Sequence, residues 1–576
     1  MLVRKKRYFP LYIIKQLVEQ KYQQQDFIAD VLAGIVIALV AIPLGISLAI
    51  SVGVDPQVGL YTTIVAGLIT AIMGGSRFQI TGPTAAFVAV LLPIVHQYGY
   101  SGLVLTTCLA GIFLLGMGYA RFGRMIQFIP YPVTAGFTAG IGVVILSLQI
   151  KDLLGMTLSR IPVGFIDRLY VYSDAFYTFS VPEAVVGGIT LTLILAFKKY
   201  IKKVPAPVLA LPMVGSACFC VSLFFPDMHI QTLQTTFTSL HNGRIIHGIP
   251  SVLPTFSSPF APLLEHGFVE ALQSVRPFLL PAFVVAILAA IESLLSAIVA
   301  DGITHTKHSP NAELIGLGVG NIIGSFFGTI PATGAIARTA TNIRFGARSQ
   351  IAAIIHAIAV LLIVLCAAPI ISQLPMASLA ALLTVVSFDM IQPSRLRHLL
   401  RIETKSDSIV LLSTFSLTVC FDMVIGVCIG IVLAALLLIK RTADVTQSQL
   451  VSVAERFASL EGAYPEDTIL YQIKGPLFFG ATEKAMAVVS NVMRNVHSVV
   501  FIMDAVPHMD ITGFIAFDGT VKELLARNIT VVIAGIQEQP LELLKKTHFF
   551  EDHPDIPIFK TTKNALTFLN EKEACL

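Results

Sequence analysis

Tryptophan is missing from this chain of 576 residues, and charged side chains make up only 13% of it. A soluble protein of this length needs many more charges to cover its surface, so the low charge argues against a soluble protein. Hydrophobic residues reach 55%, and the mean hydropathy is +0.79. The chain is therefore predicted to be an integral membrane protein, in which tyrosine and phenylalanine take the interfacial positions that tryptophan often holds.

Patterns typical of enzymes and of metal sites are also lacking. The seven cysteines are scattered, and most lie in apolar segments, where cysteine packs as a small hydrophobic side chain. No nucleophile–base arrangement stands out, and the polar C-terminal part has no GxGxxG or phosphate-loop pattern. We therefore expect no enzyme activity, no cofactor, no bound metal and no nucleic-acid partner.

Fourteen apolar segments follow one another along the chain. They lie at about residues 31–50, 58–74, 83–97, 102–120, 133–150, 182–197, 204–224, 278–300, 311–328, 334–343, 350–371, 375–391, 407–421 and 422–439. Most reach the roughly 17–25 residues that a spanning helix needs, whereas the third and the tenth fall short. Arginine and lysine gather before the first segment and after the even-numbered ones, which predicts that both termini are cytoplasmic. An even number of spans requires the same.

Two short stretches interrupt the apolar pattern, QITGPTAAFVAVLLP at 79–93 and GTIPATGAIARTATN at 328–342. Thr, Gly and Pro stand there where an unbroken span would have Leu and Val. Broken helix is tolerated in a membrane only where protein or a watery cavity surrounds it, and paired breaks mark the binding sites of transporters. Because the breaks fall in the third and the tenth segments, we predict two inverted repeats of seven spans each.

The two breaks would present helix N-termini, whose N–H groups and positive dipole ends suit an anion. The residues assigned to this site are Thr81, Gly82, Pro83 and Thr84 in the first break and Thr333, Gly334, Ala335 and Ile336 in the second. Small residues such as Gly82 equally suit close packing of helices. Leu44 and Leu48, after Pro43 in the first segment, would form an apolar wall of the site or simply pack in the core.

Two charged side chains accompany the breaks. Glu292 lies deep in the eighth apolar segment, and a carboxylate inside the membrane is a functional candidate by default. It could take a proton or ligate Na⁺ with Ser296, which lies one turn further on the same helix face, or it could only support packing. Arg338 follows Gly334 by one turn and would attract anions; the alternative is an arginine that reaches the cytoplasmic interface or pairs with a carboxylate.

Hydropathy drops after Arg441, and strands and helices then alternate. Strands are expected at 468–475, 498–505 and 529–535, and helices at 482–496, 511–528 and 538–550. This order predicts a small α/β domain. Thr512, at the turn before the second of these helices, would cap it or be a modification site. The predicted divisions are a cytoplasmic N-terminal segment (1–30), a transporter domain (31–440) and a cytoplasmic domain (441–576).

Several of these stretches resemble one family of transporters. VDPQVGLYTTIVAGLITAIMGGSRFQITGPTAAFVAVL (54–91) resembles the signature of the SulP anion transporters, the group that includes prestin- and pendrin-like solute carriers. IPLGISLA (42–49), IESLLSAIVADG (291–302) and NIIGSFFGTIPATGAIARTATNIRFGARS (321–349) are similar as well. The C-terminal domain resembles a STAS domain. The likeness covers nearly the whole chain.

The resemblance implies an α-helical, fourteen-span membrane protein whose core and gate domains move as an elevator. It places an anion between the N-termini of the third and tenth spans, near Thr84, Ala85, Gly334 and Ala335. It also implies that Glu292 handles a coupling ion, and a glutamate there favours H⁺ over Na⁺. In related soluble STAS proteins a phosphorylated serine stands where this chain has Thr512.

The expected function is secondary active transport of a small anion of the sulfate, bicarbonate or C4-dicarboxylate class. The alternatives are a Na⁺-coupled bicarbonate symporter, an anion exchanger or channel of the same fold, and a membrane anion sensor that signals through the STAS domain. The expected surroundings are the lipid bilayer of a bacterial inner membrane, a second copy of the chain in a homodimer, and a cytoplasmic protein that binds the STAS domain.

Overall fold

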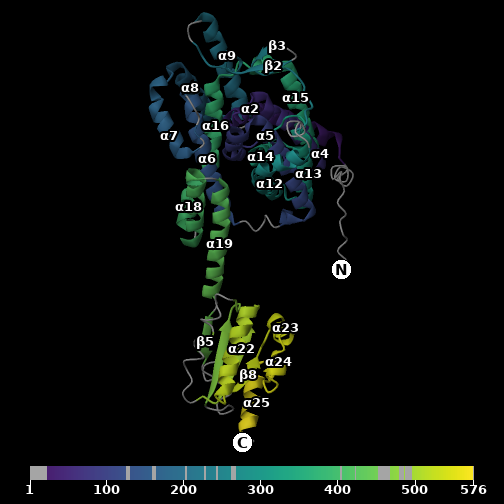
Figure 1. Ribbon diagram of the computed structural model, residues 1–576, viewed down its shortest axis with the longest axis vertical. Coiled ribbons are helices and arrows are strands. Elements are labelled where there is room, and N and C mark those ends of the chain that lie inside the picture. Colours follow the sequence, from purple (N-terminus) through teal and green to yellow (C-terminus); the bar gives the residue numbers. More distant parts are fainter. Residues whose placement is uncertain are drawn as a thin grey trace. The chain divides into compact units, whose positions relative to one another are not determined.

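The structure is a computed structural model, and it divides the chain into two compact units, Met1–Ile431 and Val432–Leu576 (Figure 1). It describes residues 22–124, 130–158, 162, 164–201, 204–225, 229–241, 244–260, 268–402, 405–421, 423–445, 447–451, 467–478, 486 and 496–574. Most of the predicted N-terminal segment 1–30 lies outside the described residues. The predicted divisions at 30 and 440 stay predictions.

The first unit is built almost entirely of helices. The long ones are α2 (Gln24–Val52), α5 (Ala85–Tyr119), α6 (Tyr131–Leu153), α8 (Val181–Tyr200), α9 (Ala206–Phe224), α12 (Phe268–Thr304), α13 (Pro310–Ser325), α15 (Ile351–Ile371), α16 (Met376–Ile391), α18 (Lys405–Cys420) and α19 (Met423–Val445). Among the described residues, ten helices are long and apolar enough to cross a membrane.

Helix is present at every one of the fourteen predicted apolar segments. The second segment forms α3 (Pro56–Tyr61), the π-helix η1 (Thr62–Ala66) and α4 (Gly67–Met73), and the tenth forms α14 (Ile336–Arg344). The third and fourth run together as α5, which is kinked at Gly99, where φ is 69°. The count of fourteen spans stays a prediction, because several of these helices are short.

Shorter elements that the apolar pattern did not predict connect the long helices. They are α7 (Phe165–Asp174), η3 (Phe176–Thr178), α10 (Leu233–Thr236), the hairpin strands β2 (Thr238–His241) and β3 (Arg244–His247), and the amphipathic α17 (Pro393–Ile402). Such short, polar pieces bury too little apolar surface to be visible in a hydropathy profile.

The helices of the first unit pack in two sets. In one set α5 lies against α12 and α13, α2 against α15, α13 against α4, and α12 against α14. In the other, α6 lies against α16 and α18, and α8 against α9 and α16. The second predicted span thus packs on the ninth and the fifth on the twelfth. Equivalent spans of two inverted repeats meet in this way around a two-fold axis, as the predicted arrangement requires.

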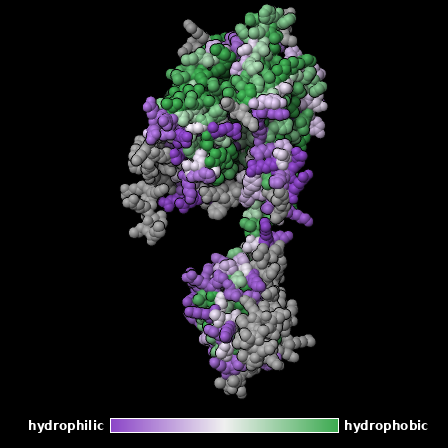
Figure 2. Space-filling model, turned by 180° about the vertical axis from the view of Figure 1, so that it is seen from behind, coloured by the Kyte–Doolittle hydropathy of each residue, from purple (hydrophilic) through white to green (hydrophobic). Residues whose placement is uncertain are grey.

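The outside of the first unit is strongly apolar. On the face that Figure 2 shows, hydrophobic residues cover a broad continuous area, while hydrophilic ones gather toward one end. Large side chains such as Phe219 and Leu362 are exposed in the sense that no protein covers them. A soluble protein rarely leaves such an area in water, so lipid is its natural surrounding.

The second unit is a five-stranded sheet with helices. Its elements are β5 (Gln447–Val451), β6 (Thr468–Lys474), β7 (Ser498–Ala505), α22 (Ile511–Ala526), β8 (Thr530–Ala534), α23 (Glu538–Lys546), α24 (Phe549–Asp552), β9 (Ile558–Phe559) and α25 (Thr562–Ala574). The strands lie in the order β5-β6-β7-β8-β9, and all pairs but β5–β6 are parallel. The α/β prediction for this domain is confirmed.

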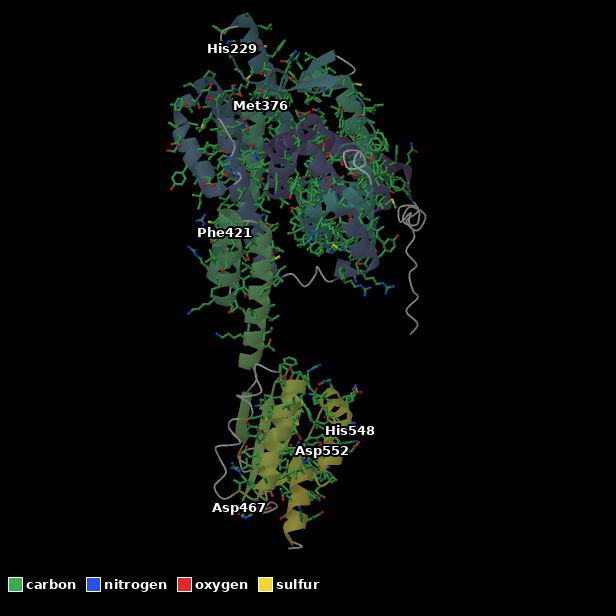
Figure 3. All side chains as sticks on the ribbon, viewed as in Figure 1. His229, Met376, Phe421, Asp467, His548 and Asp552 are labelled. Carbon is green, nitrogen blue, oxygen red and sulfur yellow. The ribbon has the colours of Figure 1, made fainter. Side chains whose placement is uncertain are left out.

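Three details of the second unit differ from the prediction or cannot be compared with it. Thr512 does not cap α22, because Asp510 does so by accepting a hydrogen bond of 2.7 Å from the Gly513 N–H. The helix expected at 538–550 is two helices, since His548 (Figure 3) has a left-handed backbone, with φ at 56°, between α23 and α24. The helix expected at 482–496 lies almost wholly outside the described residues.

Candidate functional site

The two predicted breaks meet in the structure as a pair of two-residue strands. β1 (Thr81–Gly82) and β4 (Thr333–Gly334) are antiparallel, with Thr81 opposite Gly334 and Gly82 opposite Thr333. The Ala335 N–H extends the pairing by donating to the Ile80 carbonyl at 2.9 Å. Each strand is followed at once by a helix, α5 after β1 and α14 after β4. Two helices therefore begin at one small sheet inside the helical bundle.

Neither helix start is capped by the residue that precedes it. Thr84 and Ala335 both have extended backbone at the N-cap position, and within the described residues neither side chain takes a capping hydrogen bond. The first N–H groups of a helix have no partner inside the helix and need one outside it. Pro83, which leads into α5, has no N–H, so the donors that need a partner outside the helix are those of its first residues. Such a pair of helix ends is suited to an anion.

The glycines of both strands are required by close approach. A Cβ on Gly334 would lie 2.0 Å from the Gln79 side-chain nitrogen, and one on Gly82 would lie 2.7 Å from Nη1 of Arg338. Both distances are shorter than the roughly 3.0 Å that real Cβ atoms keep, the first by a wide margin. Polar side chains thus lie directly against the backbone of both strands, and a Cβ at either position would require those side chains to move.

Glu292 reaches the first break from the middle of α12. Its Oε2 accepts a hydrogen bond of 2.6 Å from Oγ1 of Thr84, and the side chain is half-buried. Ser296, although one turn away, is fully buried and donates to Oγ1 of Thr339 at 3.1 Å. Thr339 also accepts the Ile80 N–H at 3.1 Å. Ser296 therefore supports β1 from behind, whereas Glu292 contacts the start of α5.

Arg338 is buried at the break and does not reach an interface. Only 4% of it is exposed, and Nη2 donates to the carbonyl of Pro83 at 3.1 Å. Its Nη1 lies beside Gly82 and has no hydrogen-bond partner among the described residues. The guanidinium charge thus lies next to the residue that precedes Thr84. Its positive field adds to that of the two helix ends.

The remaining predicted site residues differ in their exposure and surroundings. Thr333 is fully buried, and its hydroxyl donates to the Ala289 carbonyl at 2.7 Å. Leu48 belongs to a buried apolar cluster against which Leu44 and Ala85 pack. Ile336 is 41% exposed at the start of α14. The fold thus brings the residues of the two breaks together with Glu292 and Arg338, while the role of every predicted residue in binding stays a prediction.

Sequence reasoning missed the buried carboxylate of Glu313 next to the breaks. Glu313 on α13 is buried and accepts hydrogen bonds from the N–H groups of Gly75 and Ser76, and from the side chains of Gln79 and Ser293. Glu313 lies in the predicted span 311–328. The rule that singled out Glu292, a carboxylate inside an apolar segment, could therefore have found it as well.

A cavity of about 570 Å³ lies elsewhere in the first unit, lined by residues of α2, α9 and α15 such as Leu39, Leu211 and Ile363. None of the predicted site residues lines it, and its wall is almost wholly apolar. Its lining has no charged side chain among the described residues, and Ser216 and Gln373 are its polar residues, so the breaks remain the candidate site.

Two half-spans that start from one buried sheet, within two interlocked sets of apolar helices, define a membrane transporter with inverted repeats. The model of the sulfate permease family matches residues 27–414, and that of the STAS domain matches residues 463–565. This chain belongs to the sulfate permease family. It is a transporter and not an enzyme, and it carries a STAS domain, as the sequence motifs predicted.

Relatives and solved structures agree with this assignment. YvdB of Bacillus subtilis, a candidate sulfate transporter, is 37% identical over 88% of this chain and 92% of its own length. The bicarbonate transporter BicA of a Picosynechococcus species is 27% identical over 89% of each chain. The fold is also that of the murine anion transporter Slc26a9 in its inward-facing state, with a TM-score of 0.83, 18% identity, and 99% of this chain and 96% of that one covered.

Proposed function

We propose that this protein is a secondary active transporter that carries a small anion together with H⁺ and binds the anion between the N-termini of α5 and α14. The observation that carries the proposal is the pairing of β1 with β4, which starts both helices at one place beside the buried guanidinium of Arg338. The transporter relatives of this family, named for sulfate and for bicarbonate, support the choice of an oxyanion.

The proposed anion is held by backbone N–H groups at the starts of α5 and α14 and attracted by Arg338. Hydrogen bonds to an anion are stronger than neutral ones, and the surrounding protein strengthens them because its dielectric constant is low. Thr84 and Ala85 would contribute at the start of α5. At the second break, Gly334 and Ala335 lie just before α14 and Ile336 is its first residue; since the Ala335 N–H already donates to the Ile80 carbonyl, the N–H donors there are those of the first turn of α14. Leu44 and Leu48 would form an apolar wall of the anion site. The Pro83 carbonyl accepts a hydrogen bond from Nη2 of Arg338 and holds the guanidinium near the site. The other N–H groups of Arg338 would stay available to the anion.

The contact between Glu292 and Thr84 supports the proposal of proton coupling. While Glu292 is ionised, it accepts the Thr84 hydroxyl and repels an anion at the adjacent helix end. Protonation removes that charge, so proton binding and anion binding favour each other, and the coupling is reciprocal. When the site is empty, the positive charge of Arg338 compensates the negative charge of Glu292. Binding of a monoanion together with one proton adds no net charge. Counted over Arg338, Glu292 and the anion alone, only these two states leave no net charge, and a net buried charge is costly inside a membrane protein.

Movement of the site across the membrane would be of the elevator type. The set of helices that contains both breaks would slide against the set formed by α6, α8, α9, α16 and α18. Contacts between the sets are sparser than those within them, and they chiefly join α2 with α16 and α5 with α6. The proposed setting is a bacterial inner membrane, with both termini cytoplasmic and the chain in a homodimer, and with a cytoplasmic protein as a partner of the STAS domain.

Purified protein in proteoliposomes tests the proposal. Uptake of labelled sulfate, bicarbonate and succinate is measured with an inward pH gradient, with an inward Na⁺ gradient, and with neither. We expect one anion to accumulate above equilibrium only with the pH gradient. Accumulation driven by Na⁺ alone would replace H⁺ by Na⁺ as the coupling ion. Flux without accumulation would identify an exchanger or channel, and binding without flux a sensor.

A further inference from the structure

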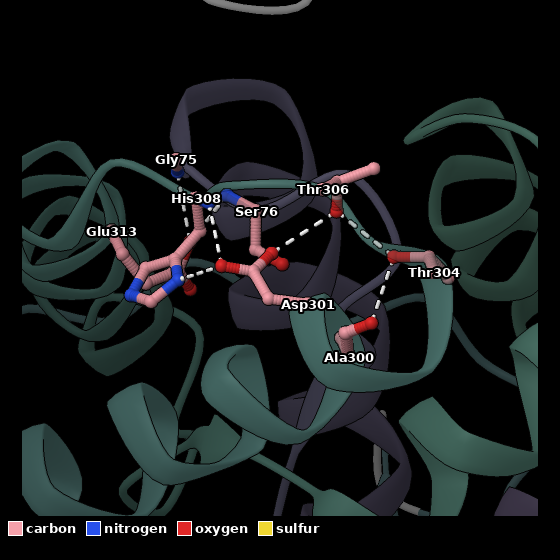
Figure 4. Close-up of polar contacts among 8 residues, drawn as sticks. All are labelled: Gly75, Ser76, Ala300, Asp301, Thr304, Thr306, His308 and Glu313. Carbon is pink, nitrogen blue, oxygen red and sulfur yellow. Dashed lines mark hydrogen bonds and ion pairs between the residues drawn. The ribbon is translucent and has the colours of Figure 1, made fainter.

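Glu313 lies where the turn before the first break meets the start of α13 (Figure 4). Its Oε2 accepts the N–H groups of Gly75 at 2.8 Å and of Ser76 at 3.0 Å. Its Oε1 accepts Nε2 of Gln79 at 2.8 Å and Oγ of Ser293 at 3.2 Å. Only 1% of Glu313 is exposed. Four donors therefore converge on one buried carboxylate.

The loop between α12 and α13 closes this arrangement from the other side. Asp301, near the end of α12, accepts the His308 N–H at 2.9 Å and pairs with His308 Nδ1 at 2.7 Å. Figure 4 shows the His308 ring lying between Asp301 and Glu313. The Ser309 N–H donates to the Gly75 carbonyl at 3.0 Å. The turn at Gly75 is thus held both by the carboxylate and by the loop.

Gln79 extends the contact from Glu313 to the second break. Besides donating to Glu313, its Nε2 lies 2.5 Å from Oγ of Ser293. The same nitrogen lies so close to Gly334 that no Cβ fits there. Gln79 is 6% exposed, and only two residues separate it from Gly82. The side chain of Gln79 thus contacts β4 directly, while its backbone continues into β1.

We propose that Glu313 is a positioning residue for the anion site: it holds Gln79 against Gly334 and so fixes how the N-termini of α5 and α14 face each other. The inference rests on the proposed anion site, but it adds a residue that contacts neither anion nor proton. A small displacement of Gln79 would shift the strand pair and change the spacing of the N–H groups at both helix ends. Glu313 therefore controls affinity for the anion, not the coupling to H⁺.

The substitution Glu313→Gln tests this inference because it keeps the shape and removes one acceptor. A glutamine offers one oxygen and one NH₂ group. If the oxygen faces Gly75 and Ser76, the NH₂ group faces the NH₂ group of Gln79, and donor meets donor. In the opposite orientation the N–H groups of Gly75 and Ser76 lose their acceptor. Either way a buried donor stays unpaired, which disturbs the position of Gln79.

We expect Glu313→Gln to raise the half-saturation concentration of the anion about tenfold, the factor given by about 1.4 kcal/mol. Accumulation driven by a pH gradient at saturating anion should persist, since Glu292 is unchanged. The matched control is Glu183→Gln on α8. Glu183 is 2% exposed and accepts the Gln231 N–H, so the same substitution at similar burial should leave the half-saturation concentration as in the wild type.

The double variant Gln79→Glu with Glu313→Gln separates positioning from general damage. In this variant the introduced amide at position 313 can accept from Gly75 and Ser76 and donate to the introduced carboxylate at position 79. The hydrogen bond between the two side chains is thus restored with its polarity reversed. We expect the anion affinity to recover at least partly, also if Glu313→Gln alone fails to reach the membrane.

Two results would overturn the inference. One is an unchanged half-saturation concentration in Glu313→Gln, and the other is a double variant that is no better than the single ones. If the wild type neither binds nor transports an anion, the proposed function fails instead.

Discussion

Oγ1 of Thr84 donates a hydrogen bond of 2.6 Å to Oε2 of Glu292, although 208 positions separate the two residues in the chain. Thr84 directly precedes α5, and Glu292 lies in the interior of α12. The contact joins the carboxylate that we propose to carry the proton to a helix start that we propose to bind the anion. A change of charge on Glu292 therefore changes the electrostatic field at the start of α5.

Glu292→Gln should abolish accumulation of the anion by a pH gradient, because the amide is permanently neutral and carries no proton across. The glutamine oxygen can still accept from Thr84, so anion binding should remain measurable. Uptake by proteoliposomes and equilibrium binding of the labelled anion are the two measurements. Undiminished pH-driven accumulation would remove Glu292 from the coupling.

Arg338→Ala should raise the half-saturation concentration of the anion by about tenfold or more, since hydrogen bonds to charged groups contribute about 1.5–3 kcal/mol. The control is Arg344→Ala, which removes the same charge from the exposed end of the same helix. The half-saturation concentrations are obtained from initial uptake rates at increasing anion concentrations. Equal half-saturation concentrations in both variants and the wild type would show that Arg338 serves the fold alone.

Gly334→Ala should lose transport, because the added Cβ would lie 2.0 Å from Nε2 of Gln79 and force β4 away from β1. Gly302→Ala on α12 is the matched control, since a Cβ there meets no described atom within 4 Å. Both variants are compared at equal amounts of membrane-inserted protein. Wild-type uptake by Gly334→Ala would contradict the tight packing of Gln79 against the strand.

In the C-terminal domain, Asp518 should stabilise the fold at neutral pH and lose this effect in acid. Burial alone would raise its pKa, but hydrogen bonds from Lys522 and His553, followed by their charges, outweigh burial and lower the pKa of the carboxyl. A lowered pKa in the folded state means that stability is present above the unfolded value near 3.8 and disappears as the pH falls below it.

Asp518→Asn measures this contribution. Hydrogen exchange of the α22 amides is measured in the full chain at pH 7. The free energy of opening should be lower in the variant than in the wild type by about 1–2 kcal/mol. After correction for the intrinsic exchange rate, the difference between variant and wild type should shrink below about pH 4. A difference that is constant with pH would show that the charge of Asp518 is irrelevant.

The sequence was most informative where one property repeats over many residues. Apolar segments of spanning length predict helices whatever their neighbours are, because burying backbone in lipid allows little else. The same reasoning located both breaks from Thr, Gly and Pro alone, and the motifs around them identified the family. Glu292 and Arg338 were visible as charges in apolar surroundings. Each of these signals is local, so each could be read without a structure.

The contact partners of these residues, in contrast, are known only from the tertiary structure. Nothing in the chain shows that Thr81 lies opposite Gly334, that Ser296 bonds to Thr339 instead of sharing a ligand with Glu292, or that Glu313 holds Gln79. These contacts join positions far apart in sequence, and the choice of partner depends on how whole helices pack. Composition and spacing thus determined a membrane transporter with two broken spans, while only tertiary packing, which fixes distances across the bundle, determined how the two breaks form one site.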